Sequence, residues 1–361
     1  METSLPAREG HDNAAGQAYT VLNNYFRSRE YQVVEIEVLP TAFIPPEGSL
    51  ILEDGDCIGI PKKVLASAFL TARSLFFRSL NQQRQPASEC LEYSRIMLLF
   101  DPEHLTAANF RKRYLMHLVE ENGTSDCEDV GRFITFEYWF LDSVLTSPLH
   151  RQSKSPTLWY HRRWLLQAFY PLVLTCVDTC SQFTPLQDFL EKEISAVLKS
   201  GERHPKNYYA WQYARRLVEQ LEKEDLAGGA EEFAAHIRDC TQRVSDWCLR
   251  NPSDTSGWNF LLFLLEKPAQ NEAEVESLLS RILGILDSFK WEHESIWAFL
   301  RVALSGKVTI PHATRQEYIH GLEKQWGMQN GELCTRARPE QPPIPTTAQK
   351  SLAWIHANGE A

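Results

Sequence analysis

The stretches SKSPTLWYHRRWLL at residues 153–166 and HPKNYYAWQYARRLV at residues 204–218 decide the expected fold. Each is a helical pattern in which a tryptophan, Trp159 or Trp211, is followed by apolar residues on one face. Other copies read DPEHLTAANFRKRYL at 101–115, NPSDTSGWNFLLFLL at 251–265 and, more weakly, WEHESIWAFLRVAL at 291–304. Ordinary core packing would explain any one of these tryptophans, so the recurrence is what indicates a repeat.

The copies align on a single column that is occupied by Ala108, Trp159, Trp211, Trp258 and Trp297. Neighbouring members of this column lie about 39 to 52 residues apart, a spacing typical of arrays of paired helices. In three copies a proline stands six residues earlier, where it ends the preceding helix and starts a turn: Pro102, Pro205 and Pro252. We therefore predict an all-α repeat fold, with each indole filling the gap between neighbouring helical hairpins.

The region before the repeats has a different pattern. EYQVVEIEVLP at 30–40 alternates apolar and charged residues, and SLILEDGDCIGI at 49–60 places Asp54–Gly55 between two β-branched runs. These signals predict a small β-hairpin cap, followed by a helix with an apolar stripe from Val64 to Leu80. The expected domains are 1–85, a cap with hairpin and helix; 86–330, about five helical-hairpin repeats; and 331–361, a proline-rich tail.

Composition narrows the class of protein. The chain has 361 residues and a formal net charge of -10, which argues against non-specific nucleic-acid binding. The eight cysteines include no C-x-x-C pair, and Cys176 and Cys180, one helical turn apart, have no histidine or carboxylate pattern to complete a metal site. We expect no metal in this chain, buried thiols in a reducing compartment, no membrane span and a cytoplasmic protein.

The repeat resembles that of a known family. PKNYYAW at 205–211, followed by Arg215 and Arg216, and SPTLWYHRRW at 155–164 are similar to the repeat of protein prenyltransferase α subunits, approximately N-Y-x-x-W-x-x-R-R. The resemblance covers about residues 86–305. Within the family, the order of hairpin, long helix and a first copy without the N-Y pair resembles the branch of α-subunit repeat-containing proteins.

The resemblance implies a fold and a division of labour. The α subunit would be a right-handed α-α superhelix, a crescent solenoid of helical hairpins that wraps a β subunit. The β subunit would hold the zinc, the isoprenoid pocket and most of the peptide site, so no cofactor is expected in this chain. A β subunit shared with Rab geranylgeranyltransferase is one candidate partner.

The implied function is support for prenyl transfer. As an α-type subunit of a heterodimeric protein prenyltransferase, the chain would help to transfer a geranylgeranyl or farnesyl group from an isoprenoid diphosphate to a C-terminal cysteine of an acceptor protein. Without its β subunit it would be inactive. The alternative is a non-catalytic helical-repeat scaffold for protein interactions.

Three residues are implied to approach the chemistry. Lys154 stands five positions before Trp159, where the family's lysine approaches the diphosphate, and its positive charge would stabilise the departing group. The alternative is a solvated lysine, because a Ser-Pro pair replaces the usual N-Y after it. Tyr208 matches a tyrosine near the subunit interface and diphosphate region, with plain packing as the alternative. Tyr209 stands where farnesyltransferase has a histidine.

The resemblance also implies a subunit interface. Its expected members are Trp159, Arg162, Arg163, Lys206, Asn207, Trp211, Arg215 and Arg216. Arginine in this column suits ion pairs, either to the next helix pair or to a partner surface. His161 precedes the first arginine pair, and we expect it to pack between helices rather than to act as a base or ligand.

Overall fold

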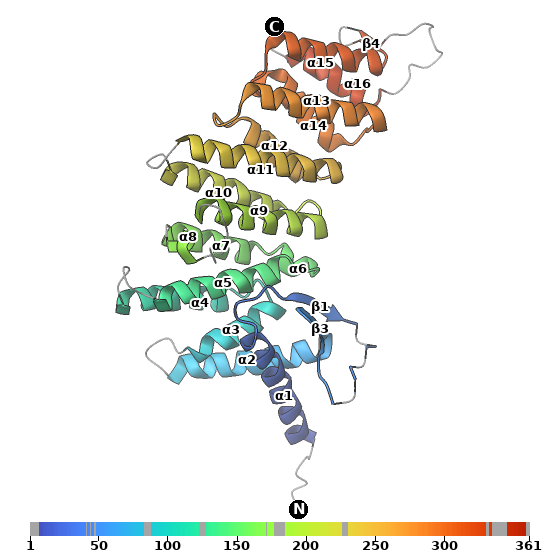
Figure 1. Ribbon diagram of the computed structural model, residues 1–361. Helices are drawn as coiled ribbons and strands as arrows, with labels where there is room; N and C mark the ends of the chain where they lie inside the picture. The colour runs from blue at the N-terminus through green and yellow to red at the C-terminus, as the bar shows by residue number, and fades with distance from the viewer. Residues whose placement is uncertain are drawn as a thin grey trace, which may run out of the picture. The chain divides into compact units, whose positions relative to one another are not determined.

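The computed structural model describes residues 7–40, 42–43, 45–46, 48–82, 88–122, 128–170, 172–176, 185–225, 230–329, 332–333 and 345–358. The described residues are mostly helical, with a small three-stranded sheet near the N-terminus (Figure 1), so the predicted class and the N-terminal cap are confirmed in this coarser form. They form two compact units, Met1–Tyr213 (unit 1) and Ala214–Ala361 (unit 2). The predicted domain borders stay predictions.

Unit 1 opens with two helices and the sheet. The elements are α1 (Ala7–Arg27), β1 (Glu35–Leu39), β2 (Leu52–Asp54), β3 (Cys57–Pro61) and α2 (Lys62–Gln82). Strand β3 lies between the other two, antiparallel to β2 and parallel to β1. The predicted hairpin is thus β2–β3, and Gly55 at its turn has a φ of 57°, which glycine adopts without strain. The alternating segment is β1.

Polar contacts fix the sheet and the residue before it to two later helices of the same unit. The backbone N–H of Val34 donates to Ser143 Oγ at 2.8 Å, and Glu35 on β1 pairs with Lys199 and Arg203. Burial would raise the pKa of Glu35, but hydrogen bonds from Arg203 and Lys199 outweigh it and lower the pKa. These contacts hold the cap against the repeat helices.

Helices fill the rest of unit 1, as the repeat pattern predicts. They are α3 (Glu89–Phe100), α4 (Leu105–Asn122), α5 (Glu128–Leu145), α6 (His150–Ser153), α7 (Pro156–Phe169), α8 (Leu172–Cys176), α9 (Pro185–Arg203) and α10 (Tyr208–Asp225), which crosses the border between the units. The short helices α6 and α8 were not predicted, because one turn has too few residues to show a helical period.

Unit 2 contains the remaining repeats. Its elements are α11 (Ala230–Arg250), α12 (Thr255–Leu265), α13 (Glu272–Phe289), α14 (Glu294–Val302), the π-helical turn η1 (Ala303–Lys307), α15 (His312–Gln325), β4 (Met328–Gln329), β5 (Glu332–Leu333) and α16 (Thr347–Asn358). The predicted tail ends in α16, which buries Leu352 and Ile355 and packs against α14 and α15. Most of the predicted proline-rich segment lies outside the described residues. None of the described helices has the length and apolar character to cross a membrane.

Candidate functional site

In three repeats the second helix begins at a capping residue four positions before the column of tryptophans. A side-chain oxygen there accepts a hydrogen bond from the backbone N–H three residues further on, at 3.1 Å for Ser155, 3.4 Å for Asn207 and 2.9 Å for Asp254. These residue types are the ones that satisfy the free N–H groups of a helix N-terminus. The asparagine of the repeat is therefore a helix cap, and serine can replace it.

The indoles of three repeats make the same hydrogen bond. Nε1 of Trp159, Trp258 and Trp297 donates to the carbonyl oxygen six residues earlier, at 2.8, 3.1 and 3.0 Å. The rings of Trp159 and Trp258 also contact an aromatic ring of the next repeat, with centroids 5.4 Å from Tyr213 and 5.1 Å from Phe299. The predicted role of the indoles, filling the gap between neighbouring hairpins, is confirmed at these two positions.

The carbonyl that receives the indole also joins one repeat to the next. In unit 1, the carbonyl oxygen of Ser153 accepts Nδ2 of Asn207 at 3.0 Å in addition to its own indole. In unit 2, the carbonyl oxygen of Pro252 accepts Ser295 Oγ at 2.6 Å in the same way. The turns before Trp159 and Trp258 are thus contact points between neighbouring repeats.

A buried charged triad crosses the first two repeats. Arg111 on α4 is fully buried and its Nε donates to Glu137 Oε1 on α5 at 2.9 Å, while His161 Nε2 on α7 lies 2.9 Å from Glu137 Oε2. Burial alone would raise the pKa of Glu137, but Arg111 and His161 outweigh it and bring the pKa to about 2. Burial lowers the pKa of His161. Its predicted packing role is confirmed.

A second buried cluster follows one repeat later. Arg162 on α7 donates to Glu193 on α9 at 2.7 Å, pairs with Asp142 on α5 at 2.7 Å, and Glu193 also accepts the Tyr213 hydroxyl. Burial and then the Glu193 charge raise the pKa of Asp142 to about 6, although the charge of Arg162 lowers it. The pKa of Arg162 is raised because its two acidic partners outweigh the effect of burial.

The acidic members of these clusters were not predicted. Glu137 had a signal, because it is a lone charge within the apolar run FITFEYWFL at 133–141. A charged residue in a helix of that kind is expected to have a buried partner. Glu193 lies in an amphipathic helix with many charges, and nothing in its local pattern separates it from its exposed neighbours.

Lys154, the predicted diphosphate contact, lies at the C-terminal end of α6. Its Nζ donates to the carbonyl oxygen of Pro205 at 3.0 Å, so the side chain lies against the turn before α10. His204, in the same turn, has its ring 5.5 Å from that of His150, and burial followed by the charges of His150 and Lys154 lowers the pKa of His204. Basic groups therefore gather at these turns.

The other predicted site residues belong to the same turn. Tyr208 is the first residue of α10 and is 62% exposed, with its ring 5.5 Å from that of half-buried Tyr209. Lys206 is exposed and has a φ of 60°, a left-handed conformation that aims the chain into the cap at Asn207. We call Lys154, Lys206, Tyr208 and Tyr209 the turn cluster. The hydrogen bond from Lys154 to Pro205 thus places the predicted residue of repeat two against the turn that precedes those of repeat three.

The predicted interface residues fall into two groups. Trp159, Arg162, Asn207 and Trp211 are at most 3% exposed, and this corrects their expected role: they stabilise the chain's own helices and offer no side-chain surface to a second chain. The remaining members reach the surface fully or in part: Arg163, Lys206, Arg215 and Arg216.

The two arginines of repeat three differ from those of repeat two. Arg215 donates to the carbonyl oxygen of Asn259 at 2.7 Å and lies over the Phe263 ring, and exposed Arg216 pairs with Glu219 on its own helix. In repeat three the position that matches Arg162 is Ala214, because the arginine pair lies one residue later after the tryptophan.

Cys90, Cys240 and Cys248 are buried, whereas Cys57 on β3 is exposed, which corrects the expectation of buried thiols at that position. Burial raises the pKa of Cys90, of Cys240 to about 12, and of Cys248, so these thiols are protonated at neutral pH. Across the described ranges, no group of three or more histidine, cysteine, aspartate or glutamate side chains is placed to hold a metal ion. Cys180, half of the cysteine pair considered as a metal site, lies outside the described residues.

Comparison with known proteins gives two family matches. Residues 144–169 match the protein prenyltransferase alpha subunit repeat, and residues 159–284 match the ECM9 middle domain.

Individual relatives point the same way. Protein prenyltransferase alpha subunit repeat-containing protein 1-B of Xenopus laevis is 24% identical over 222 residues, 58% of this chain and 46% of the relative. Geranylgeranyl transferase type-2 subunit alpha 2 of Arabidopsis thaliana is 29% identical over 165 residues, 44% of this chain and 22% of the relative. Protein ECM9 of Saccharomyces cerevisiae is 23% identical over 225 residues, 61% of this chain and 52% of the relative.

The chain spans about half or less of the length of these curated relatives. The matches confirm the resemblance predicted from the repeat: the chain carries the protein prenyltransferase alpha subunit repeat and is related to proteins that are named for it.

Proposed function

We propose that this chain is the α-type subunit of a heterodimeric protein prenyltransferase. Its helical hairpins would continue as a right-handed superhelix around a β subunit, and the pair would transfer a geranylgeranyl or farnesyl group to a cysteine thiol. The β subunit shared with Rab geranylgeranyltransferase is the first candidate partner, because one relative is named as a subunit of a type-2 geranylgeranyl transferase. The site of action would be cytoplasmic.

The turn cluster is the observation that carries this proposal. Lys154 reaches from repeat two to the turn of repeat three, where exposed Lys206 and Tyr208 follow. An ammonium group and a phenol that both reached one diphosphate could bind its oxygens, since the first supplies positive charge and the second one donor. Both would favour departure of a diphosphate as its negative charge develops. The zinc of the β subunit would supply the activated thiolate.

To bind a diphosphate, the Lys154 amine would have to give up its one described hydrogen bond. The amine donates to the carbonyl oxygen of Pro205 in this chain, and this hydrogen bond is exposed to solvent. An exposed lysine bond to a neutral carbonyl is weak, whereas a bond to a phosphate oxygen is charge-assisted on both sides. In the proposed complex the amine would therefore turn from the backbone to the diphosphate.

The test is a reconstitution with variants. The chain is purified with candidate β subunits, and transfer of prenyl groups from geranylgeranyl and farnesyl diphosphate is measured. We expect Lys154→Ala to lower kcat on the order of 10- to 100-fold without weakening assembly, because one charge at the leaving group is lost. Lys63→Ala is the matched control, since Lys63 is an exposed lysine on α2 away from the turn cluster. An active complex that is unaffected by Lys154→Ala would remove this residue from the mechanism.

The rival function is a non-catalytic scaffold. One observation favours it: Ser155, which replaces the usual residue after the lysine, caps α7 and binds the carbonyl oxygen of Pro102 at 3.2 Å, so this turn is fully used in packing. A scaffold would form stable complexes without turnover. Failure to assemble with any β subunit would refute the enzyme proposal and leave the scaffold.

A further inference from the structure

Unit 1 contains a cavity that the repeat motif does not explain. It has a volume of about 420 Å3 and is lined by residues of α3, α4, α5 and the segment after α1. Its walls include four aromatic residues, Tyr31, Tyr114, Phe133 and Phe136, beside five charged ones, of which Arg95 on α3 is the most buried. This size is typical of pockets for small ligands.

The Arg95 guanidinium has few partners. The side chain is 2% exposed and lies between two rings, with its carbon 5.6 Å from the Phe26 centroid and 5.3 Å from the Phe136 centroid. Its one hydrogen bond runs from Nη2 to Asn23 Oδ1 at 3.1 Å, and its Nε is buried without a partner among the described residues. A buried N–H without an acceptor is costly, so its presence in the fold calls for an explanation.

The other fully buried arginines are neutralised, and Arg95 is not. Arg111 pairs with Glu137, and Arg162 pairs with Glu193, each inside the fold. No carboxylate of a described residue lies within ion-pair distance of Arg95. Burial and the neighbouring Arg111 charge lower the pKa of Arg95 to about 10, so the group is still charged at neutral pH. The cavity therefore has an unneutralised cation at its wall.

Two acidic residues at the rim already have partners, and a third, Glu30, also lines the cavity, where its charge raises the pKa of Arg95. Glu92 pairs with Arg27 at 3.3 Å and accepts Nδ2 of Asn23 at 2.7 Å. Asp129 lies 3.9 Å from Arg132 on the same helix. These acids do not neutralise Arg95, but their charge would disfavour a dianion more than a monoanion.

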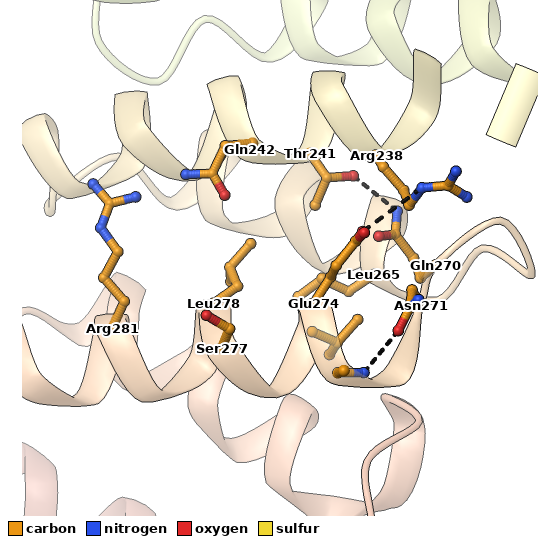
Figure 2. Close-up of a pocket in the computed structure, with 12 residues that line it drawn as sticks. Arg238, Thr241, Gln242, Leu265, Gln270, Asn271, Glu274, Ser277, Leu278 and Arg281 are labelled. Carbon is orange, nitrogen blue, oxygen red and sulfur yellow. Dashed lines mark hydrogen bonds and ion pairs between the residues drawn. The ribbon is translucent and has the colours of Figure 1, made fainter. Parts of the chain in front are cut away.

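A larger cavity between α11 and α13 in unit 2 lacks this feature (Figure 2). It has a volume of about 570 Å3, and some of its polar side chains bind one another. Gln270 Nε2 donates to Thr241 Oγ1 at 2.8 Å, and Arg238 lies 3.7 Å from Glu274. No buried charge of this groove is left for a ligand to neutralise.

We propose that the unit 1 cavity binds a small monocarboxylate with an aromatic or branched apolar body, whose carboxylate pairs with Arg95. The aromatic walls would cover the apolar body, and a carboxylate oxygen would accept the free Nε–H. The same chemistry is offered by a free acid and by the C-terminal carboxylate of a peptide that ends in an apolar residue. This inference does not depend on the proposed function.

The test uses 3-phenylpropionate and the full chain in isothermal titration calorimetry at neutral pH. We expect saturable binding of the acid with one site, and at least tenfold weaker binding of the matched neutral 3-phenylpropanamide. Phenyl phosphate should also bind at least tenfold more weakly, because the rim repels a dianion. A peptide ending in phenylalanine, compared with its C-terminal amide, decides whether a chain terminus is also accepted. Absence of binding by the acid, or equal binding of acid and amide, overturns the proposal.

Substitutions distinguish a loss of ligand binding from a loss of folding. Arg95→Met keeps the length of the side chain, removes the charge, and should reduce the affinity for 3-phenylpropionate at least tenfold while circular dichroism retains the helical spectrum. Leu118→Trp, at the half-buried wall on α4, should block the cavity while Arg95 stays in place. Arg113→Met is the matched control, since Arg113 is an exposed arginine of α4. Unchanged affinity in both Arg95→Met and Leu118→Trp would show that the acid binds elsewhere.

Discussion

Single buried charges set the energetics of the first repeats. Glu137 has no exposed surface and is held by a guanidinium from α4 and an imidazole from α7. Removing one partner of such a set leaves an uncompensated charge in a medium that solvates it poorly. The carboxylate is therefore worth more to the fold than any of the exposed ion pairs, which water and salt screen.

Glu137→Gln tests this at the residue scale. The amide keeps the shape of the side chain but leaves Arg111 without its counter-charge, so we expect the free energy of unfolding to fall by about 3 kcal/mol. Glu219→Gln is the control, because Glu219 pairs with Arg216 at the surface and its loss should change the free energy by less than about 0.5 kcal/mol. Urea unfolding at pH 7 measures both. Equal effects of the two substitutions would contradict the buried-triad interpretation.

Helix α10 shows how an element is fixed by its first turn. The Asn207 side chain caps the helix with its oxygen and, with its nitrogen, binds the carbonyl oxygen of Ser153 at 3.0 Å and Ser200 Oγ at 2.8 Å. Asparagine is suited to both tasks because its amide carries an acceptor and a donor. The start of the helix and its attachment to the preceding repeat therefore depend on one residue.

Aspartate at this position separates the two tasks. Asn207→Asp keeps the capping oxygen but places a buried carboxylate against a carbonyl oxygen, so we expect it to lower the midpoint of thermal unfolding at least as much as Asn207→Ala does. Asn271→Asp is the matched control: Asn271 caps α13 at 2.9 Å through its oxygen, and aspartate caps equally well. Wild-type stability of Asn207→Asp would show that capping alone matters.

At the scale of the whole molecule, the buried ion pairs are confined to one of the two compact units. The clusters around Glu137 and Arg162 lie in unit 1, whereas the salt bridges described within unit 2 all have at least one partner at or near the surface. Because the pKa of Glu137 falls from 4.5 to about 2 on folding, its stabilisation is complete above about pH 4.5 and is lost as the pH falls toward 2. The pKa of Asp142 is raised on folding, so its ionisation destabilises the fold. This group therefore lowers the stability as the pH rises from about 4 to 6.

We therefore expect acid to open unit 1 before unit 2. Hydrogen–deuterium exchange read by mass spectrometry at pH 3 should show loss of protection in peptides of α5 and α7 while α11 and α13 stay protected. In Glu137→Gln the acid-dependent loss in unit 1 should be smaller, because the group that titrates is gone. Simultaneous loss of protection in both units would show that other carboxylates control the acid transition.

Local pattern accounts for most of the elements. The apolar stripe from Val64 to Leu80 gave α2, and Asp54–Gly55 gave the β2–β3 hairpin, because periods of 3.6 and 2 and the turn residues are properties of neighbouring positions. The strand pair β4–β5 was missed, since two residues per strand show no period. The recurring tryptophans identified the repeat for the same reason, because each copy repeats one local arrangement.

The sequence by itself determined where the helices run, that they repeat, and which family the repeat resembles. Only the tertiary structure decided that Arg162 is inside while Arg216 is outside, that Lys154 binds the carbonyl of Pro205, and that Arg95 lines a cavity without a counter-charge. Arg162 and Arg216 lie in similar helical patterns, so the local sequence does not distinguish them. Their burial and partners depend on residues brought close by packing, 31 positions apart for Arg162 and Glu193, and no local period encodes that proximity.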